Sequence, residues 1–201
     1  MLINNMFTDF CGSEDLNNSF DLKKIKDELL RYKDNLDPKG KKVEVSNRGG
    51  YQSNDLNFKE IVKDYPNLKS LFDYTINTVK NLLEYDNVVI GNAWFNINKS
   101  GNHNTRHSHP GSIISGVIYI DVPKDIEGGQ LVFHRERSFG EFQIGKFLSR
   151  DEYGSINYTI HPFTGLFVLF PSNIEHSVEQ HFSESDRITV AINFPCEPPN
   201  K

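Results

Sequence analysis

The chain has 201 residues, of which 37% are hydrophobic and 24% charged, and its formal net charge is −5. These values fit one ordinary folded domain and argue against global disorder. The acidic balance disfavours duplex nucleic acid as the main partner, because duplex binding needs a clustered basic face. No apolar run reaches the roughly 20 residues of a membrane span and no signal peptide is evident, so we expect a cytoplasmic protein, or one in the host cytoplasm if a phage encodes it.

Helical patterns dominate residues 1–86. Asp21 can cap a first helix, whose apolar residues recur at helical spacing up to about Asp37. A second amphipathic pattern begins at Pro66 and continues for about four turns. Between the two helices, residues 46–53 are polar and contain two glycines, so we expect a loop there. Two interpretations of this loop stay open: a plain surface connection, or a segment that reaches a functional site.

From residue 87 onward the pattern changes to short β-rich runs separated by turn residues. We expect strands within residues 87–97, 112–122, 129–134, 165–170 and 187–194. Strands without intervening helical patterns predict an antiparallel sandwich or barrel. We therefore expect a single domain, residues 1–201, in which a helical extension (1–86) packs on a β core (87–196).

Three histidines have the spacing of a metal site. His107 and His109 stand two residues apart, directly before the expected strand at 112–122. In an extended chain, residues i and i+2 project from the same face, so both imidazoles can reach one ion. His176 follows a buried strand and a Pro-Ser break, which makes it the candidate third ligand.

Arg187 opens an alternating strand, in which Thr189, Ala191 and Asn193 share its face. An arginine aimed into a barrel needs an anionic partner, because a buried unpaired charge is costly. A ligand carboxylate held by the guanidinium would satisfy it. The alternative is an edge arginine that points to solvent.

In this order, the motifs resemble the iron(II) and 2-oxoglutarate-dependent oxygenases, and more narrowly an oxygenase family of bacteria and their phages. The run His107-Ser-His-Pro-Gly-Ser-Ile-Ile-Ser-Gly-Val-Ile-Tyr119 carries the resemblance. It continues in Phe170-Pro171-Ser172, His176-Ser177-Val178, Arg187-Ile188 and Asn193, and residues 46–53 resemble an upstream segment of the same family.

The resemblance implies a mainly β fold with flanking helices, whose core is a double-stranded β-helix (jelly roll). It implies Fe(II), 2-oxoglutarate as co-substrate, O2, and an oxidised primary substrate that it does not identify; the expected reaction is a hydroxylation coupled to 2-oxoglutarate decarboxylation. The metal ligands would be His107, His109 and His176, and Arg187, Tyr119 and Thr189 would bind 2-oxoglutarate. Further residues are expected to line the pocket or support the ligands: Asn98, His103, Trp94, Asn96, Val117, Leu131, Phe133 and Asn193.

His109 departs from the usual pattern, because a carboxylate normally completes the two-histidine facial triad. A cupin-type three-histidine metal dioxygenase is therefore one alternative, although the glutamate of the first cupin motif, due at Ile113 or Ile114, is missing. A non-catalytic β-barrel binding protein is another. The remaining histidines receive peripheral assignments: His134 at the surface, His161 in a turn and His181 in a polar loop.

Overall fold

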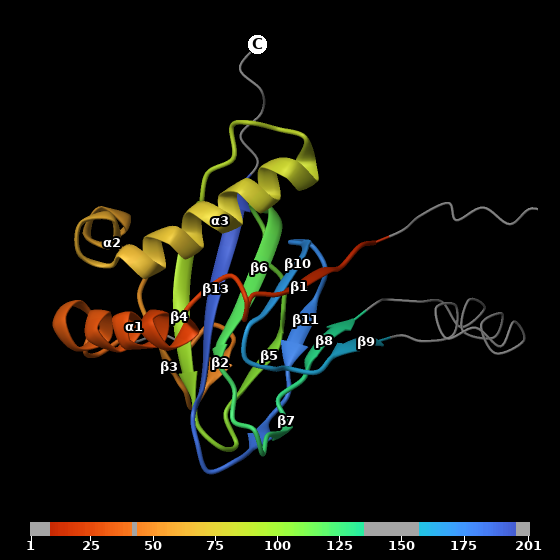
Figure 1. Ribbon diagram of the computed structural model, residues 1–201. Helices are drawn as coiled ribbons and strands as arrows, with labels where there is room; N and C mark the ends of the chain where they lie inside the picture. Colours follow the sequence, from red (N-terminus) through yellow and green to blue (C-terminus); the bar gives the residue numbers. More distant parts are fainter. Residues whose placement is uncertain (1–8, 42–43, 135–156, 196–201) are drawn as a thin grey trace, which may run out of the picture.

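In the residues that the structure describes, the fold consists of two large antiparallel sheets, one two-stranded sheet and three helices (Figure 1). The computed structural model describes residues 9–41, 44–134 and 157–195, so Cys196, the last residue of the expected β core, lies outside them. The helices are α1 (Leu22–Leu36), α2 (Phe58–Asp64) and α3 (Pro66–Leu83). The strands are β1 (Gly12–Asp15), β2 (Asn47–Arg48), β3 (Tyr51–Gln52), β4 (Asn92–Asn98), β5 (His103–His107), β6 (Ser112–Asp121), β7 (Glu127–Gly128), β8 (Leu131–His134), β9 (Asn157–Ile160), β10 (Leu166–Pro171), β11 (His176–Val178), β12 (His181–Phe182) and β13 (Arg187–Pro195).

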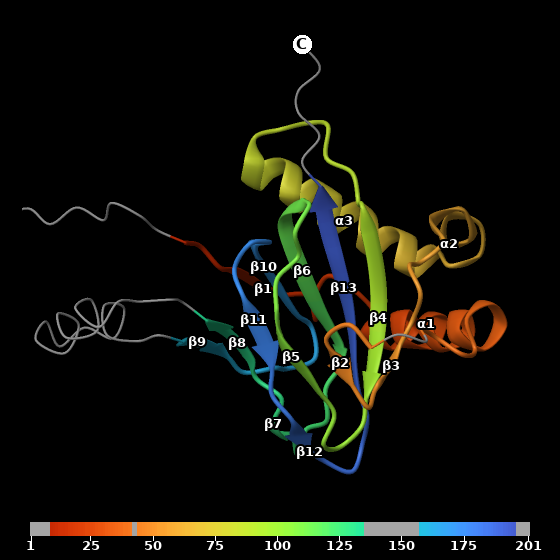
Figure 2. The same cartoon turned by 180° about the vertical axis from the view of Figure 1, so that it is seen from behind.

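Among the described strands, the larger sheet has the order β1-β10-β6-β13-β4-β3 and the smaller one β2-β5-β11-β8-β9. Seen from behind, β5 and β11 of the smaller sheet lie in front of β6 and β13 of the larger one (Figure 2). A third pair, β7 and β12, lies beside them. The expected mainly β fold with flanking helices is thus confirmed, and its jelly-roll arrangement places the inner faces of two sheets opposite each other.

The larger sheet is buried on both faces. Its alternate residues Phe95, Ile118 and Val190 belong to one apolar cluster with the helices, on the outer face. The residues between them, such as Tyr119 and Val168, belong to a second cluster inside the barrel. Because side chains alternate across a strand, one run of residues supplies both layers. The inner layer is the one that can form a site.

The two predicted helices follow the sequence pattern, and one tertiary contact is added to it. Asp21 caps α1 by accepting the Lys24 backbone N–H at 3.1 Å, as predicted. The start of α3 has no side-chain cap of its own. Instead the buried Glu28 of α1 accepts the backbone N–H groups of Asn67 (3.2 Å) and Leu68 (2.8 Å). A carboxylate at a helix N-terminus satisfies free N–H groups and favours the helix dipole.

The polar segment 46–53 is more regular than a loop. It forms the short strands β2 and β3, which pair with β5 of the smaller sheet and β4 of the larger one. The segment therefore closes one edge of the barrel by joining both sheets. Nor did the sequence predict α2 or the strands β1, β5, β7, β9 and β12. Among the described residues, no helix combines the length and apolar character that a membrane span requires.

Candidate functional site

The three predicted metal-binding histidines meet inside the barrel. His107 ends β5, His176 begins β11, and the two are direct cross-strand partners. His109 follows β5 in the turn that leads to β6. One ring nitrogen from each lies within 4.8 Å of the others, a spacing that one ion can bridge after small side-chain shifts. In the described part of the chain, this is the one such group of three or more His, Cys, Asp or Glu side chains.

Backbone carbonyls orient two of the imidazoles. Nδ1 of His107 lies 2.7 Å from the Thr105 carbonyl oxygen, and Nδ1 of His176 lies 2.9 Å from that of Ile174. A carbonyl oxygen only accepts, so each Nδ1 carries the proton and donates it. Each Nε2 then keeps its lone pair free, which is the arrangement found for metal-binding histidines.

Burial keeps the three imidazoles neutral. Desolvation lowers the pKa of His176 to about 3 and, together with the nearby His107, that of His109 to about 4. It also lowers the pKa of His107. A metal ion therefore meets three unprotonated ligands at neutral pH, with no proton to displace. These residues fit a divalent metal.

Aromatic side chains surround the group. Trp94 lies beside His109, with ring centroids 5.7 Å apart. Phe170 and Phe133 lie 4.7 and 6.1 Å from the His176 ring, and they contact each other at 4.8 Å. Phe133 also belongs to the inner apolar cluster with Leu131, against which Val117 packs. An apolar wall of this kind restricts water around the imidazoles.

Arg187 is enclosed in the same barrel and is 1% exposed. Its Nη1 donates to the Gly129 carbonyl oxygen at 3.0 Å, while its Nε has no partner among the described residues. No described carboxylate lies within ion-pair distance of it. Burial lowers the pKa of Arg187, and the nearby Tyr119 opposes this effect. The barrel thus holds a guanidinium with spare donors, for which the described part of the chain offers no counter-ion.

The other residues predicted around the co-substrate share this inner face. Tyr119, which is 1% exposed, is the cross-strand partner of Thr189. On the opposite side of β13, Asn98, Asn96 and Trp94 of β4 pair with Arg187, Thr189 and Ala191 in turn. Two rows of side chains therefore lead from the guanidinium toward the imidazoles.

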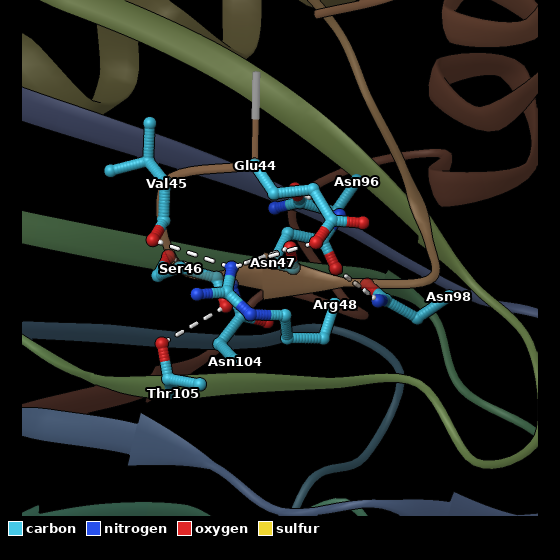
Figure 3. A network of polar contacts seen from close by, with 9 residues as sticks. All are labelled: Glu44, Val45, Ser46, Asn47, Arg48, Asn96, Asn98, Asn104 and Thr105. Carbon is cyan, nitrogen blue, oxygen red and sulfur yellow. Dashed lines mark hydrogen bonds and ion pairs between the residues drawn. The ribbon is translucent and has the colours of Figure 1, made fainter. Parts of the chain in front are cut away.

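Segment 46–53 contributes a side chain to this interior. Asn47 of β2 is buried between two predicted pocket residues: it accepts a hydrogen bond from Asn98 Nδ2 at 2.9 Å and donates to Asn96 Oδ1 at 3.4 Å (Figure 3). Asn98 Oδ1 has no hydrogen-bond partner among the described residues. Gly50 passes directly over the cluster, where a Cβ atom would overlap Asn98 Nδ2. The segment is therefore more than a plain surface connection, and its contribution to a functional site stays a prediction.

Other predicted residues lie in different surroundings. Asn193 accepts a hydrogen bond from the buried Ser115 hydroxyl at 2.7 Å. His103 is the β5 partner of Arg48, and its Nδ1 is buried without a described partner. The assignment of His181 to a polar loop was wrong, because its side chain is fully buried and its Nε2 donates to the Asn98 carbonyl oxygen at 3.0 Å.

No described carboxylate takes the place of His109. Glu175, next to His176, faces outward and forms an ion pair with Arg106. Asp121, at the end of β6, pairs with Lys26 at 2.5 Å. Two site-supporting residues escaped the sequence reasoning altogether, Ser115 and Ser172. Ser115 stands in the quoted run from His107 to Tyr119 and Ser172 in the quoted Phe-Pro-Ser motif, and these motifs were the available signals.

Comparison with known proteins adds the family. Residues 92–193, about half of the chain, match the family model described as "Putative 2OG-Fe(II) oxygenase". The chain belongs to this family. A search of the curated proteins found no match.

Solved 2OG oxygenases share the fold at low identity. A prolyl-4-hydroxylase from Pseudomonas putida matches with a TM-score of 0.60 and 16% identity, over 95% of each chain. HygX from Streptomyces hygroscopicus, solved with nickel and 2-oxoglutarate bound, gives a TM-score of 0.59 and 12% identity, over 92% of this chain and 82% of its own. An oxidoreductase of the 2OG-Fe(II) oxygenase family from Burkholderia pseudomallei matches more weakly (TM-score 0.46, 14% identity, 60% of this chain), and the match spans 49% of that protein.

Proposed function

We propose that this 2OG-Fe(II) oxygenase is a hydroxylase that holds Fe(II) with His107, His109 and His176 and 2-oxoglutarate with Arg187. One observation carries the proposal: a buried guanidinium, with no counter-ion among the described residues, shares a barrel with three neutral imidazoles. Burying a cation costs free energy unless an anion compensates its charge. A dicarboxylic acid that reaches from the metal to Arg187 would do so.

Each part of the barrel has a task in this scheme. The three imidazoles leave part of the coordination sphere open, because they supply only three ligands. Arg187 binds the far carboxylate of 2-oxoglutarate, and Tyr119 and Thr189 lie beside it on the same face. The bound iron would supply the oxidative chemistry with O2. The apolar wall around His176 limits water near the reacting atoms.

A neutral third imidazole has an electrostatic consequence. Replacing a carboxylate ligand by His109 leaves the metal site one unit more positive. With Fe(II) and the Arg187 cation, the two carboxylates of 2-oxoglutarate would leave one uncompensated positive charge in the barrel, where a carboxylate ligand would leave none. The structure of HygX with nickel and 2-oxoglutarate supports the capacity of this fold to hold a metal and this co-substrate together. None of these residues identifies the primary substrate.

Anaerobic reconstitution tests the proposal. The apo protein is titrated with Fe(II) and then with 2-oxoglutarate, and chelation of the 2-oxo acid is followed by the visible charge-transfer band it produces. Oxygen is then admitted and succinate is measured. We expect iron binding, the band, and slow succinate formation even without a primary substrate.

Two results would contradict the proposal in different ways. Iron binding without 2-oxoglutarate binding would favour the cupin-type three-histidine dioxygenase. Failure to bind any divalent metal would favour a non-catalytic barrel. His109→Ala separates the ligand assignments, since unchanged iron affinity would show that this imidazole does not coordinate.

A further inference from the structure

A buried chain of hydrogen bonds lies behind the imidazoles. Ser115 of β6, Ser172 after β10 and Asn193 of β13 are 1%, 0% and 5% exposed. The hydroxyl oxygens of the two serines lie 2.7 Å apart, and Ser115 Oγ lies 2.7 Å from Asn193 Oδ1. Polar side chains at such depth are retained where their full set of bonds fixes a particular geometry, because apolar residues would pack there at lower cost.

Proton counting fixes the direction of the chain. Asn193 Oδ1 only accepts, so the single Ser115 hydroxyl proton points to it. The Ser172 hydroxyl must then donate to Ser115 Oγ. Every link therefore depends on the next, and the chain ends on β13, a central strand of the larger sheet.

Ser172 connects this chain of hydrogen bonds to the backbone of His109. Its backbone N–H donates to the Ile113 carbonyl oxygen at 3.0 Å, and its carbonyl oxygen accepts the His109 N–H at 2.9 Å. With the hydroxyl bond, three hydrogen bonds hold this one residue. The turn that carries His109 is thus held by a hydrogen bond to the Ser172 carbonyl oxygen.

The turn around Ser172 also supports His176. The Ile174 N–H donates to the Pro171 carbonyl oxygen at 3.1 Å, which closes the turn around Ser172. The Ile174 carbonyl oxygen then accepts the Nδ1 proton of His176 at 2.9 Å. Ser172 therefore holds the His109 backbone directly, and the turn around it presents the carbonyl group that orients His176.

We infer that Ser115, Ser172 and Asn193 are positioning residues, which set His109 and His176 at the spacing the metal needs. This inference rests on the proposed metal-binding function. Residues that hold metal ligands in place typically change metal affinity by 10- to 100-fold when removed, although they never touch the ion.

Co(II) titration of the full chain, followed by visible absorption, tests the inference without turnover. We expect Ser172→Ala and Ser115→Ala each to weaken Co(II) binding about tenfold or more, with an altered spectrum. Because the two hydroxyls form one chain, the double variant should weaken binding little more than either single variant.

Ser53→Ala is the matched control. Ser53 is also 1% exposed, and its hydroxyl makes two hydrogen bonds, to Asn54 O and from the Phe95 N–H. It lies against the helix-covered strand segment and not against the imidazoles. Its removal should lower the apo melting temperature about as much as the other variants, yet leave Co(II) affinity within twofold.

The outcomes separate the two levels of the proposal. If the wild-type chain binds no Co(II), the proposed function fails. If it binds Co(II) and the folded Ser172→Ala and Ser115→Ala variants bind it as tightly, the positioning role is refuted. If Ser172→Ala does not fold, Ser115→Ala, which leaves the turn residue in place, decides the question alone.

Discussion

Removing the Arg187 guanidinium should have opposite effects on binding and on folding. Arg187→Met keeps an unbranched side chain and deletes the charge. Truncating one member of a buried charge pair costs about 2–5 kcal/mol, so 2-oxoglutarate should bind about thirty- to several-thousand-fold more weakly. Without ligand, the wild-type cation is buried, and no residue that the structure describes acts as its counter-ion.

The folding effect follows from two opposing contributions. The substitution removes a desolvation penalty of several kcal/mol. It also removes the bond to the Gly129 carbonyl oxygen, which as a charged hydrogen bond is worth about 1.5–3 kcal/mol. The free energy of unfolding of the apo protein should therefore stay level or rise.

Two measurements check this pair of effects. Urea unfolding of the apo proteins gives the stability change, and calorimetric titration with 2-oxoglutarate in the presence of Mn(II) gives the affinity change. Arg31→Met is the control, because Arg31 lies on α1 and contacts Asp64 and Tyr65 away from the barrel. If Arg187→Met lost several kcal/mol of stability while 2-oxoglutarate still bound normally, Arg187 would be a structural buttress and the reasoning would be refuted.

Three further predictions concern stability. The apo protein should become less stable as the pH falls below 6.5, because unfolded histidines take up protons while His109 (pKa about 4) and His176 (pKa about 3) remain neutral in the fold. Each histidine can lower the free energy of unfolding by up to about 1.4 kcal/mol per pH unit. A flat urea-unfolding profile between pH 7 and 5 would contradict this. Gly50→Ala should cost about 1–3 kcal/mol, since its Cβ meets the Asn47–Asn98 pair, whereas Gly12→Ala, with open space around it, should cost far less in the same denaturation assay. Glu28→Ala should destabilise the fold by about 1–3 kcal/mol, because it leaves the N–H groups at the start of α3 without their acceptor. A melting temperature as high as that of the neighbouring variant Asp27→Ala would show that Glu28 does not stabilise this helix.

Some features could be predicted because they depend on neighbours in the chain. The cap at Asp21, the helix after Pro66 and the strand at 187–194 follow from local spacing and turn residues. Others depended on distant partners. The polar segment 46–53 has no strand pattern of its own, and it becomes β2 and β3 because the free edges of β5 and β4 supply its hydrogen bonds.

The site divides in the same way. The types and order of His107, His109, His176 and Arg187 were enough to predict a metal site and a carboxylate ligand, and the resemblance to 2OG-Fe(II) oxygenases supplied the expected chemistry. The tautomers of His107 and His176 were not predictable, because they depend on carbonyl groups whose direction the backbone sets. Nor was the hydrogen-bond partner of Asn193 predictable, because the Ser115 hydroxyl on β6 stands 78 residues away in the chain.

The amino-acid order alone therefore determined which side chains face inward, because alternation along a strand is a local property of the extended backbone. Only the tertiary structure decided which inward-facing groups meet, which of them lose their water, and which backbone groups hold them. Glu28 at the start of α3 and Ser172 behind His109 are such cases. Each acts on a residue that folding, and not the chain, brings next to it.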